Sequence, residues 1–268
     1  MNDLVKLAIE AHGGMEHWQQ VRQISATLAF GGAGLYIHGQ AAFANAPTRL
    51  TVDTQEQRTR FDPFMGNGRV GIYESTRTAV ESRYGTVIEE LKNPRDSFKP
   101  DTERWSDTQL VYFVGYAMWT YLNLPFLLLS SGVRCKEGVP YAEDGETWRT
   151  LKVTFPKSIT TQSSEQTLYI DDKGLIRRHD YDVEISGGAQ AAHYLYEQKN
   201  FDGIVFSTKR RIYQRGPDLK PNKDMVVFSA DLSDFEMKRT PSAPIPQEGS
   251  IQDEVTCFFC YHFSHRLL

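Results

Sequence analysis

The chain has 268 residues, of which 40% are apolar and 24% are charged, with a formal net charge of −4. This composition can bury a sizeable core, so we expect a globular protein and not a disordered chain. No stretch gathers basic and aromatic residues as a nucleic-acid groove would, and three cysteines are too few for a disulfide framework. Nucleic acid is therefore excluded as an expected partner, and a reducing compartment is indicated.

The first segment predicts a helix and not a secretion signal. Asp3, Lys6 and Glu10 interrupt any apolar stretch there, while Leu4 and Ala8 have helical spacing. The most apolar run, residues 122–129, is far shorter than the roughly 20 residues that span a bilayer. We expect a cytoplasmic protein with no integral membrane association.

Most of the remaining chain alternates apolar and polar residues with the period of a strand. Gly13 and Gly14 can end the first helix, and a short helical turn follows before the alternation begins at Ile24. Residues 107–130 have three- and four-residue spacing instead, which predicts one or two apolar helices bent near Pro125. Further strands are expected at 35–46, 49–54, 57–61, 69–74, 77–83, 86–92, 147–155, 166–170, 175–185, 191–200, 203–215 and 225–236.

The last residues differ in character from the rest. We expect one domain over residues 1–238 and an irregular, Pro- and Ser-rich tail over 239–268. Four side chains near the end are of zinc-ligand types: Cys257, Cys260, His262 and His265. Their spacing is too compressed for a standard zinc finger, so no metal is predicted.

Four phrases carry a resemblance to a known class: AHGGMEHWQQVRQI, MWTYLNLPFLL, DDKGLIRRHDYDVEISGGAQAAHY and FDGIVFSTKRRIY. They look like a group of proteins that resemble the LolA/LolB class of lipoprotein carriers, over about residues 4–237. The resemblance implies a mainly β fold: a strongly curved antiparallel sheet, a half or incomplete β-barrel of about ten to twelve strands, with an N-terminal helix and a central helical lid. It also implies an apolar ligand on the concave face. The missing signal peptide argues against lipoprotein shuttling.

The richest group of polar residues is RRHDYDVE, residues 177–184, followed across Gly187 and Gly188 by AAHYLYE, residues 191–197. Alternation places Arg178, Asp180, Asp182 and Glu184 on one face and His179, Tyr181, Val183 and Ile185 on the other. If the two glycines form a two-residue turn, Asp182 lies opposite His193 and Tyr181 opposite Tyr194.

This hairpin supplies the candidate catalytic residues, which are His179, Asp180, Tyr181, Asp182 and His193. In one interpretation Asp182 orients and charges His193 as an acid/base pair. In the other, the carboxylates form an ordinary solvated face and His179 is a satisfied core histidine.

Candidate ligand-binding residues are Tyr194, Tyr112, Tyr116, Trp119, Phe126 and Arg211. Aromatic residues at helical spacing also occur in simple packing, and an arginine on a strand also forms surface ion pairs. Both alternatives stay open for each residue.

Two functions fit this pattern. The first is a cofactor-independent biosynthetic enzyme of cyclase or isomerase type that acts on a largely apolar small molecule. The second is a non-catalytic carrier or sensor of a lipid or other hydrophobic ligand. No GxGxxG, GxSxG, HExxH or P-loop motif occurs, so no cofactor is expected.

Overall fold

The computed structural model describes residues 2–44, 46–66, 68–99 and 103–240. These residues form one antiparallel sheet of fifteen strands. The strands are β1 (Val21–Gly31), β2 (Thr48–Asp53), β3 (Arg58–Asp62), β4 (Arg69–Glu74), β5 (Arg77–Ser82), β6 (Val87–Lys92), β7 (Arg134–Glu137), β8 (Tyr141–Glu143), β9 (Glu146–Thr154), β10 (Glu165–Ile170), β11 (Ile176–Val183), β12 (Ala189–Phe201), β13 (Ile204–Arg215), β14 (Pro221–Asn222) and β15 (Phe228–Arg239).

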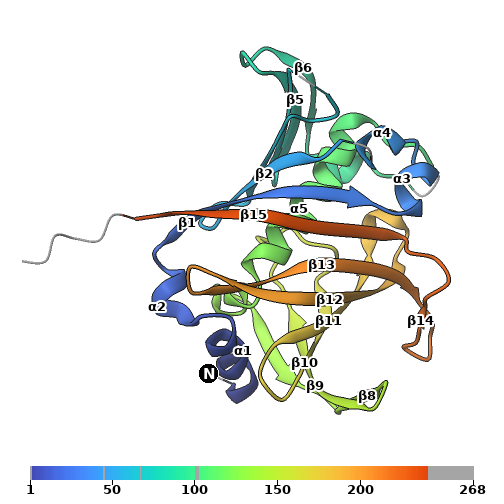
Figure 1. The fold of residues 1–268 in the computed structure, drawn as a ribbon. Coiled ribbons are helices and arrows are strands. Elements are labelled where there is room, and N and C mark those ends of the chain that lie inside the picture. Colours follow the sequence, from blue (N-terminus) through green and yellow to red (C-terminus); the bar gives the residue numbers. More distant parts are fainter. Residues whose placement is uncertain (1, 45, 67, 100–102, 241–268) are drawn as a thin grey trace, which may run out of the picture.

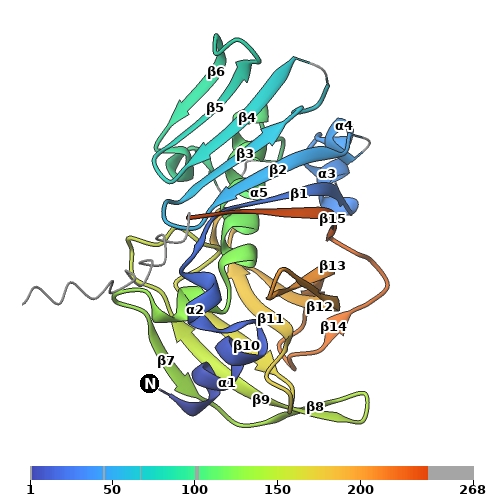
Figure 2. The ribbon, with the colours of Figure 1, turned by 60° about the vertical axis from the view of Figure 1, so that its left-hand side comes forward.

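The strand order is β6-β5-β4-β3-β2-β1-β15-β13-β12-β11-β10-β9-β7, with β14 beside β13 and β8 beside β9. Among the described residues β6 and β7 stand at opposite ends of this order, so the curved sheet stays open as a half-barrel (Figures 1 and 2). The mainly β, curved antiparallel fold is confirmed. Three very short strands, β7, β8 and β14, account for the excess over the expected ten to twelve, because two to four residues show no readable alternation.

The helices are α1 (Asp3–Ala11), α2 (Gly14–Trp18), α3 (Ala33–Ile37), α4 (Ala41–Ala44), α5 (Asp107–Asn123) and the 3₁₀ turns η1 (Pro94–Ser97), η2 (Phe126–Leu129) and η3 (Glu184–Ser186). Asn2 caps α1 by accepting a hydrogen bond from the amide of Leu4 at 2.8 Å. The strand expected at 35–46 is wrong, since α3 and α4 occupy it. Gly34 lets α3 pack closely on the ring of Phe228, because a Cβ there would lie 2.3 Å from that ring.

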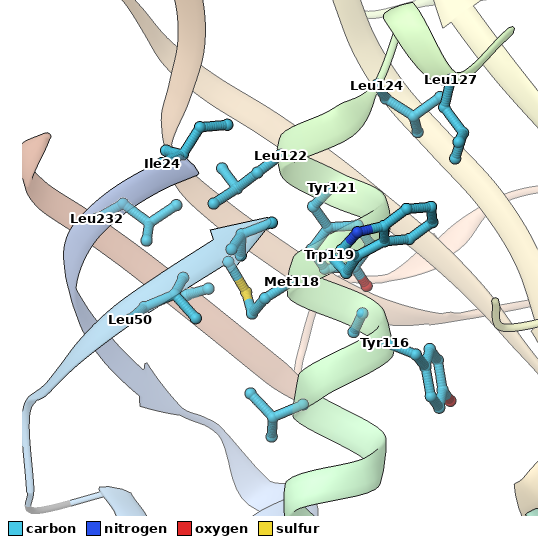
Figure 3. Close-up of a cluster of buried hydrophobic side chains, with 14 of the residues drawn as sticks. Ile24, Leu50, Tyr116, Met118, Trp119, Tyr121, Leu122, Leu124, Leu127 and Leu232 are labelled. Atoms are coloured by element: carbon cyan, nitrogen blue, oxygen red, sulfur yellow. The ribbon is translucent and has the colours of Figure 1, made fainter. Parts of the chain in front are cut away.

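Helix α5 lies inside the curve of the sheet (Figure 2). Ser106 and Gln109 form a capping box at its start, and Pro125 follows shortly after its end. Every residue from Thr108 to Asn123 is buried, as expected of a helix that is apolar all round. Met118 and Leu122 face the sheet residues Ile24, Leu50 and Leu232 (Figure 3). The helix therefore fills the concave side with core, and no helix in the described residues is long and apolar enough to cross a membrane.

Candidate functional site

The β11–β12 hairpin has a different register from the one expected. His179 pairs with His193, Tyr181 with Ala191, and Asp182 with Gln190. The predicted pairs of Asp182 with His193 and Tyr181 with Tyr194 are wrong, because η3 and the two glycines make a longer connection than a two-residue turn. The shift is an odd number of residues, so it moves every side chain of β12 to the other face of the sheet.

The alternation within β11 itself is as expected. His179 and Tyr181 lie on the inner face, against Tyr121 of α5, while Arg178 and Asp180 lie on the outer face. Because of the new register, His193 joins the inner face and Tyr194 joins the outer face, beside Arg178. The candidate residues of the hairpin therefore divide into two separate clusters.

The outer cluster is centred on Arg178, which is fully buried. Its guanidinium makes a two-point contact with Asp180, with Nε–Oδ1 2.7 Å and Nη2–Oδ2 2.8 Å. The rings of Tyr141, Tyr169 and Tyr194 lie around it with centroids 4.8–5.3 Å from Cζ. Such a buried and fully hydrogen-bonded ion pair is structural in character.

Two segments cover this cluster, which is why the expected solvated face is wrong for Arg178 and Asp180. The β8 hairpin contributes Glu143, which accepts hydrogen bonds from the Tyr194 hydroxyl and the Arg178 guanidinium. The loop after β13 contributes the carbonyl of Leu219, which accepts from Nη2 of Arg178 at 2.5 Å. Asp182 stays half exposed and pairs with Arg215 at 2.9 Å.

The inner cluster contains His179, His193, Tyr121, Tyr181 and Arg210, all of them buried. His179 Nε2 lies 2.5 Å from the side-chain oxygen of Gln166, and the hydroxyls of Tyr121 and Tyr181 are 2.5 Å apart. Among the described residues neither ring nitrogen of His193 has a hydrogen-bond partner. This cluster gathers five titratable side chains on the concave side.

Burial controls the protonation of this inner cluster. It lowers the pKa of His179 to about 3, assisted by the nearby charge of Arg210. It also lowers the pKa of His193 well below the usual range and raises the pKa of Tyr121 to about 12. Both imidazoles and both phenols are therefore neutral near pH 7.

The inner cluster has little free space. The void beside it measures about 10 Å³, which is room for about one water molecule. Side chains of His12, Tyr121, His179 and Arg210 line it. This void therefore leaves no room for a substrate between α5 and these strands.

The remaining candidates lie elsewhere. Tyr112 and Tyr116 are buried in the core, Trp119 donates its indole N–H to the carbonyls of Asp53 and Glu56, and Phe126 stacks on Trp18 with centroids 4.2 Å apart. Arg211 faces outward and pairs with Asp231 at 2.6 Å, whereas its neighbour Arg210 faces inward. Contact of these residues with a ligand stays a prediction.

An apolar groove of about 210 Å³ lies between α3 and the tip of the β11–β12 hairpin. Gly34 and Ile37 of α3 form one wall, and Val183, Ala189 and Ala191 of the hairpin form another. The remaining lining residues are His38, Ser186, Gln190, Ile212, Tyr213, Gln214, Met225, Val227 and Phe228. In the described residues no carboxylate, ammonium or guanidinium lines this groove.

Sequence reasoning missed this groove because it read α3 as part of a strand. Ile37 is 60% exposed and Met225 45% exposed, so two large apolar side chains face solvent at its rim. The hairpin contributes to the groove, but through its small and apolar residues and not through its titratable ones. A larger open hollow of about 820 Å³ beside β7 and β9–β11 is instead lined by charges of both signs, including Arg134, Lys152 and Glu165.

Metal ligands do not gather in the described part of the chain, where no three His, Cys, Asp or Glu side chains lie close enough to hold an ion. Cys257, Cys260, His262 and His265 lie outside the described residues. The zinc question for the tail therefore stays open.

Comparison with known proteins gives likeness in fold. No family model matches the chain, and no curated protein matches its sequence. A domain described as an outer membrane lipoprotein-sorting protein from Vibrio parahaemolyticus superposes with a TM-score of 0.51 at 12% identity, covering 88% of this chain and 91% of that one. A DUF1329 family protein from Desulfovibrio piger gives a TM-score of 0.50 at 13% identity, covering 88% and 92%.

A LolA superfamily protein from Nitrosomonas europaea gives a TM-score of 0.49 at 12% identity, covering 89% of this chain and 94% of that one. At such identities the likeness concerns the fold alone. With the open antiparallel sheet and its enclosed helix, the chain has the fold of the LolA-like half-barrel class.

Proposed function

We propose that this chain binds a largely apolar small molecule in the groove between α3 and the β11–β12 hairpin, and that it acts as a non-catalytic carrier or sensor. The observation that carries the proposal is the uncharged and mainly apolar lining, with Ile37 and Met225 exposed at the rim. A soluble surface keeps large apolar side chains together in a concave site mainly where they meet a ligand or partner.

The volume limits the ligand. Small-molecule sites commonly measure roughly 300–1,000 Å³, so a groove of 210 Å³ suits a small apolar compound or one end of a longer chain. Because charged side chains are missing from the lining, the bound part of the ligand is uncharged. Polar contacts are limited to groups such as Gln190 and Gln214 at the same end of the sheet.

A related solved structure carries the description of a lipoprotein-sorting protein, which fits a role in handling hydrophobic molecules. For the present chain we take from this description only the proposal that the ligand is hydrophobic. A cytoplasmic location remains a prediction, which fractionation of the expressing cell tests.

The enzymatic alternative, a cofactor-free cyclase or isomerase, would rely on His179 and His193 as acid and base. Burial lowers the pKa of His179 to about 3 and that of His193 well below its usual range, away from the values that suit a general acid or base near pH 7. The void beside them admits about one water molecule. Catalysis there would need α5 or η2 to move away from the sheet. The carrier role needs no such movement and is therefore the better-supported proposal.

Binding of N-phenyl-1-naphthylamine, a neutral apolar fluorophore, tests the groove directly. Ile37→Asp and Met225→Asp place a charge in the lining, and each is expected to weaken binding roughly tenfold because the carboxylate must be desolvated. Val139→Asp is the matched control, since Val139 is 84% exposed and lies outside the groove. Equal binding by all four proteins would place the ligand site elsewhere.

Mass spectrometry separates carrier from enzyme. A compound that copurifies with the protein is extracted, identified and incubated again with fresh protein. Recovery of the same compound unchanged supports the carrier role, whereas a product of altered mass or isomeric form supports catalysis.

A further inference from the structure

The inner face of β13 carries a buried arginine that lacks a counter-charge. Arg210 is 3% exposed, and none of the ion pairs among the described residues involves it. Its Nη2 donates to the carbonyl of Tyr121 at 3.3 Å, whereas its Nε has no hydrogen-bond partner among the described residues. The other buried arginine of the hairpin region, Arg178, contacts Asp180 at two points.

An uncompensated guanidinium in a core is unfavourable, because the loss of hydration is not offset by an opposite charge. The ring of Tyr121 lies 5.1 Å from Cζ of Arg210 and supplies a weak cation–π contact. This contact does not replace a negative charge. Asp171, which acts electrostatically on the neighbouring His12, already pairs with Arg177 at 3.5 Å.

The void of about 10 Å³ lies directly against Arg210. Polar side chains of His12, His179, Gln198 and Ser207 share its lining with Tyr121, and no carboxylate lines it among the described residues. The space holds one particle of about the size of a water molecule. Sulfate, phosphate and organic anions are too large for it.

We propose that this void is a site for a single small monovalent anion of halide size, such as chloride, held by the Arg210 guanidinium. The proposal is independent of the apolar groove, which lies nearer the tip of the β11–β12 hairpin. The free Nε–H of Arg210 supplies a charge-assisted hydrogen bond, and the surrounding apolar side chains strengthen the attraction by excluding water.

A halide at this position would also act on the three histidines near Arg210. The charge of Arg210 lowers the pKa of His12, His179 and His193, in each case in addition to burial. A bound anion opposes this effect. Proton uptake by these imidazoles and anion binding therefore favour each other.

Thermal unfolding of the full chain at constant ionic strength tests the site, with sodium chloride replaced stepwise by sodium gluconate. A ligand that binds the folded state alone raises the melting temperature by roughly 3–5 °C for each tenfold increase above its Kd in a protein of this size. Gluconate, which does not fit the void, is expected to give no such rise. Identical curves in the two salts would overturn the proposal and leave the void to a water molecule.

Two variants of β13 locate the effect. Arg210→Met removes the guanidinium that is proposed to hold the anion, and the chloride dependence is expected to disappear. Lys209→Met removes a charge from the adjacent residue, which faces outward and is 44% exposed, and the dependence is expected to remain. Chloride dependence that persists in Arg210→Met would refute the assignment.

If Arg210→Met fails to fold, anomalous diffraction from bound bromide locates the site instead. Crystals of the unaltered protein grown in sodium bromide are expected to show an anomalous peak beside Nε of Arg210. A peak restricted to surface positions would mean an adventitious ion only and would contradict the buried site.

Discussion

His179 of β11 and His193 of β12 stand directly opposite each other on the inner face of the sheet, with ring centroids 5.9 Å apart. Both rings contact Tyr121 of α5 and both are buried. Their chemical situations differ, however. His179 has a hydrogen-bonded partner in Gln166, whereas among the described residues His193 has none.

The first prediction uses this difference. His193→Leu removes a buried polar ring whose nitrogens are unpaired in the described structure, and we expect it to be neutral or to stabilise the protein by about 1 kcal/mol. His179→Leu leaves the Gln166 oxygen without its partner and is expected to destabilise by about 1–3 kcal/mol. Urea unfolding measures both. A strongly destabilised His193→Leu would contradict this account of the core.

The same two histidines bear on catalysis. If the inner cluster is an acid/base site, His179→Ala or His193→Ala lowers turnover of the substrate by roughly 10²-fold or more. If the chain is a carrier, ligand affinity for both variants stays close to that of the unaltered protein, because neither residue lines the apolar groove. Turnover and affinity measured on the copurified compound distinguish the two outcomes.

The second prediction concerns acid. Burial lowers the pKa of His12 to about 4 and that of His179 to about 3, so between pH 6.5 and these values the unfolded chain binds more protons than the folded one. Their contribution to stability is complete above pH 6.5 and declines as the pH falls, by up to about 1.4 kcal/mol per pH unit for each histidine. Urea midpoints measured from pH 7.5 to 4.5 check this.

A matched pair of variants identifies the source of the pH dependence. His179→Gln removes one titrating group from the core and should make the decline less steep. His17→Asn changes an exposed histidine and serves as the control. Equal slopes in all three proteins would mean that other groups, such as carboxylates, cause the loss.

The third prediction concerns the outer cluster. Asp180→Asn removes the charge that Arg178 and Arg215 share, and we expect a loss of about 3–5 kcal/mol because a buried guanidinium then lacks its main partner. Asp231→Asn breaks the half-exposed pair with Arg211 and should cost less than about 1 kcal/mol. Comparable losses in the two variants would show that the outer cluster is not a special stabilising feature.

The fourth prediction concerns the close approach of α5 to β4. A Cβ on Gly115 would lie 2.3 Å from Cβ of Tyr73, so Gly115→Ala forces the helix and strand apart. Overpacking of this kind costs about 1–3 kcal/mol and outweighs the gain of about 1 kcal/mol in helix propensity. A higher melting temperature for Gly115→Ala would show that this contact yields easily.

The sequence by itself determined the class of the fold. Alternation of period two marked the strands, the change to helical spacing marked α5, and the alternation within β11 separated His179 from Arg178 correctly. These features are local, since each depends on how neighbouring residues point from one backbone. Composition likewise indicated a large apolar core.

Tertiary structure alone decided the site. The register of β11 and β12 depended on a connection whose length the two glycines did not reveal, and this placed His193 inward and Tyr194 outward. Burial of Arg178 required β8 and the loop after β13, and the apolar groove required α3 to meet a hairpin distant in sequence. Such contacts join segments far apart along the chain, so no local pattern encodes which side chains will meet.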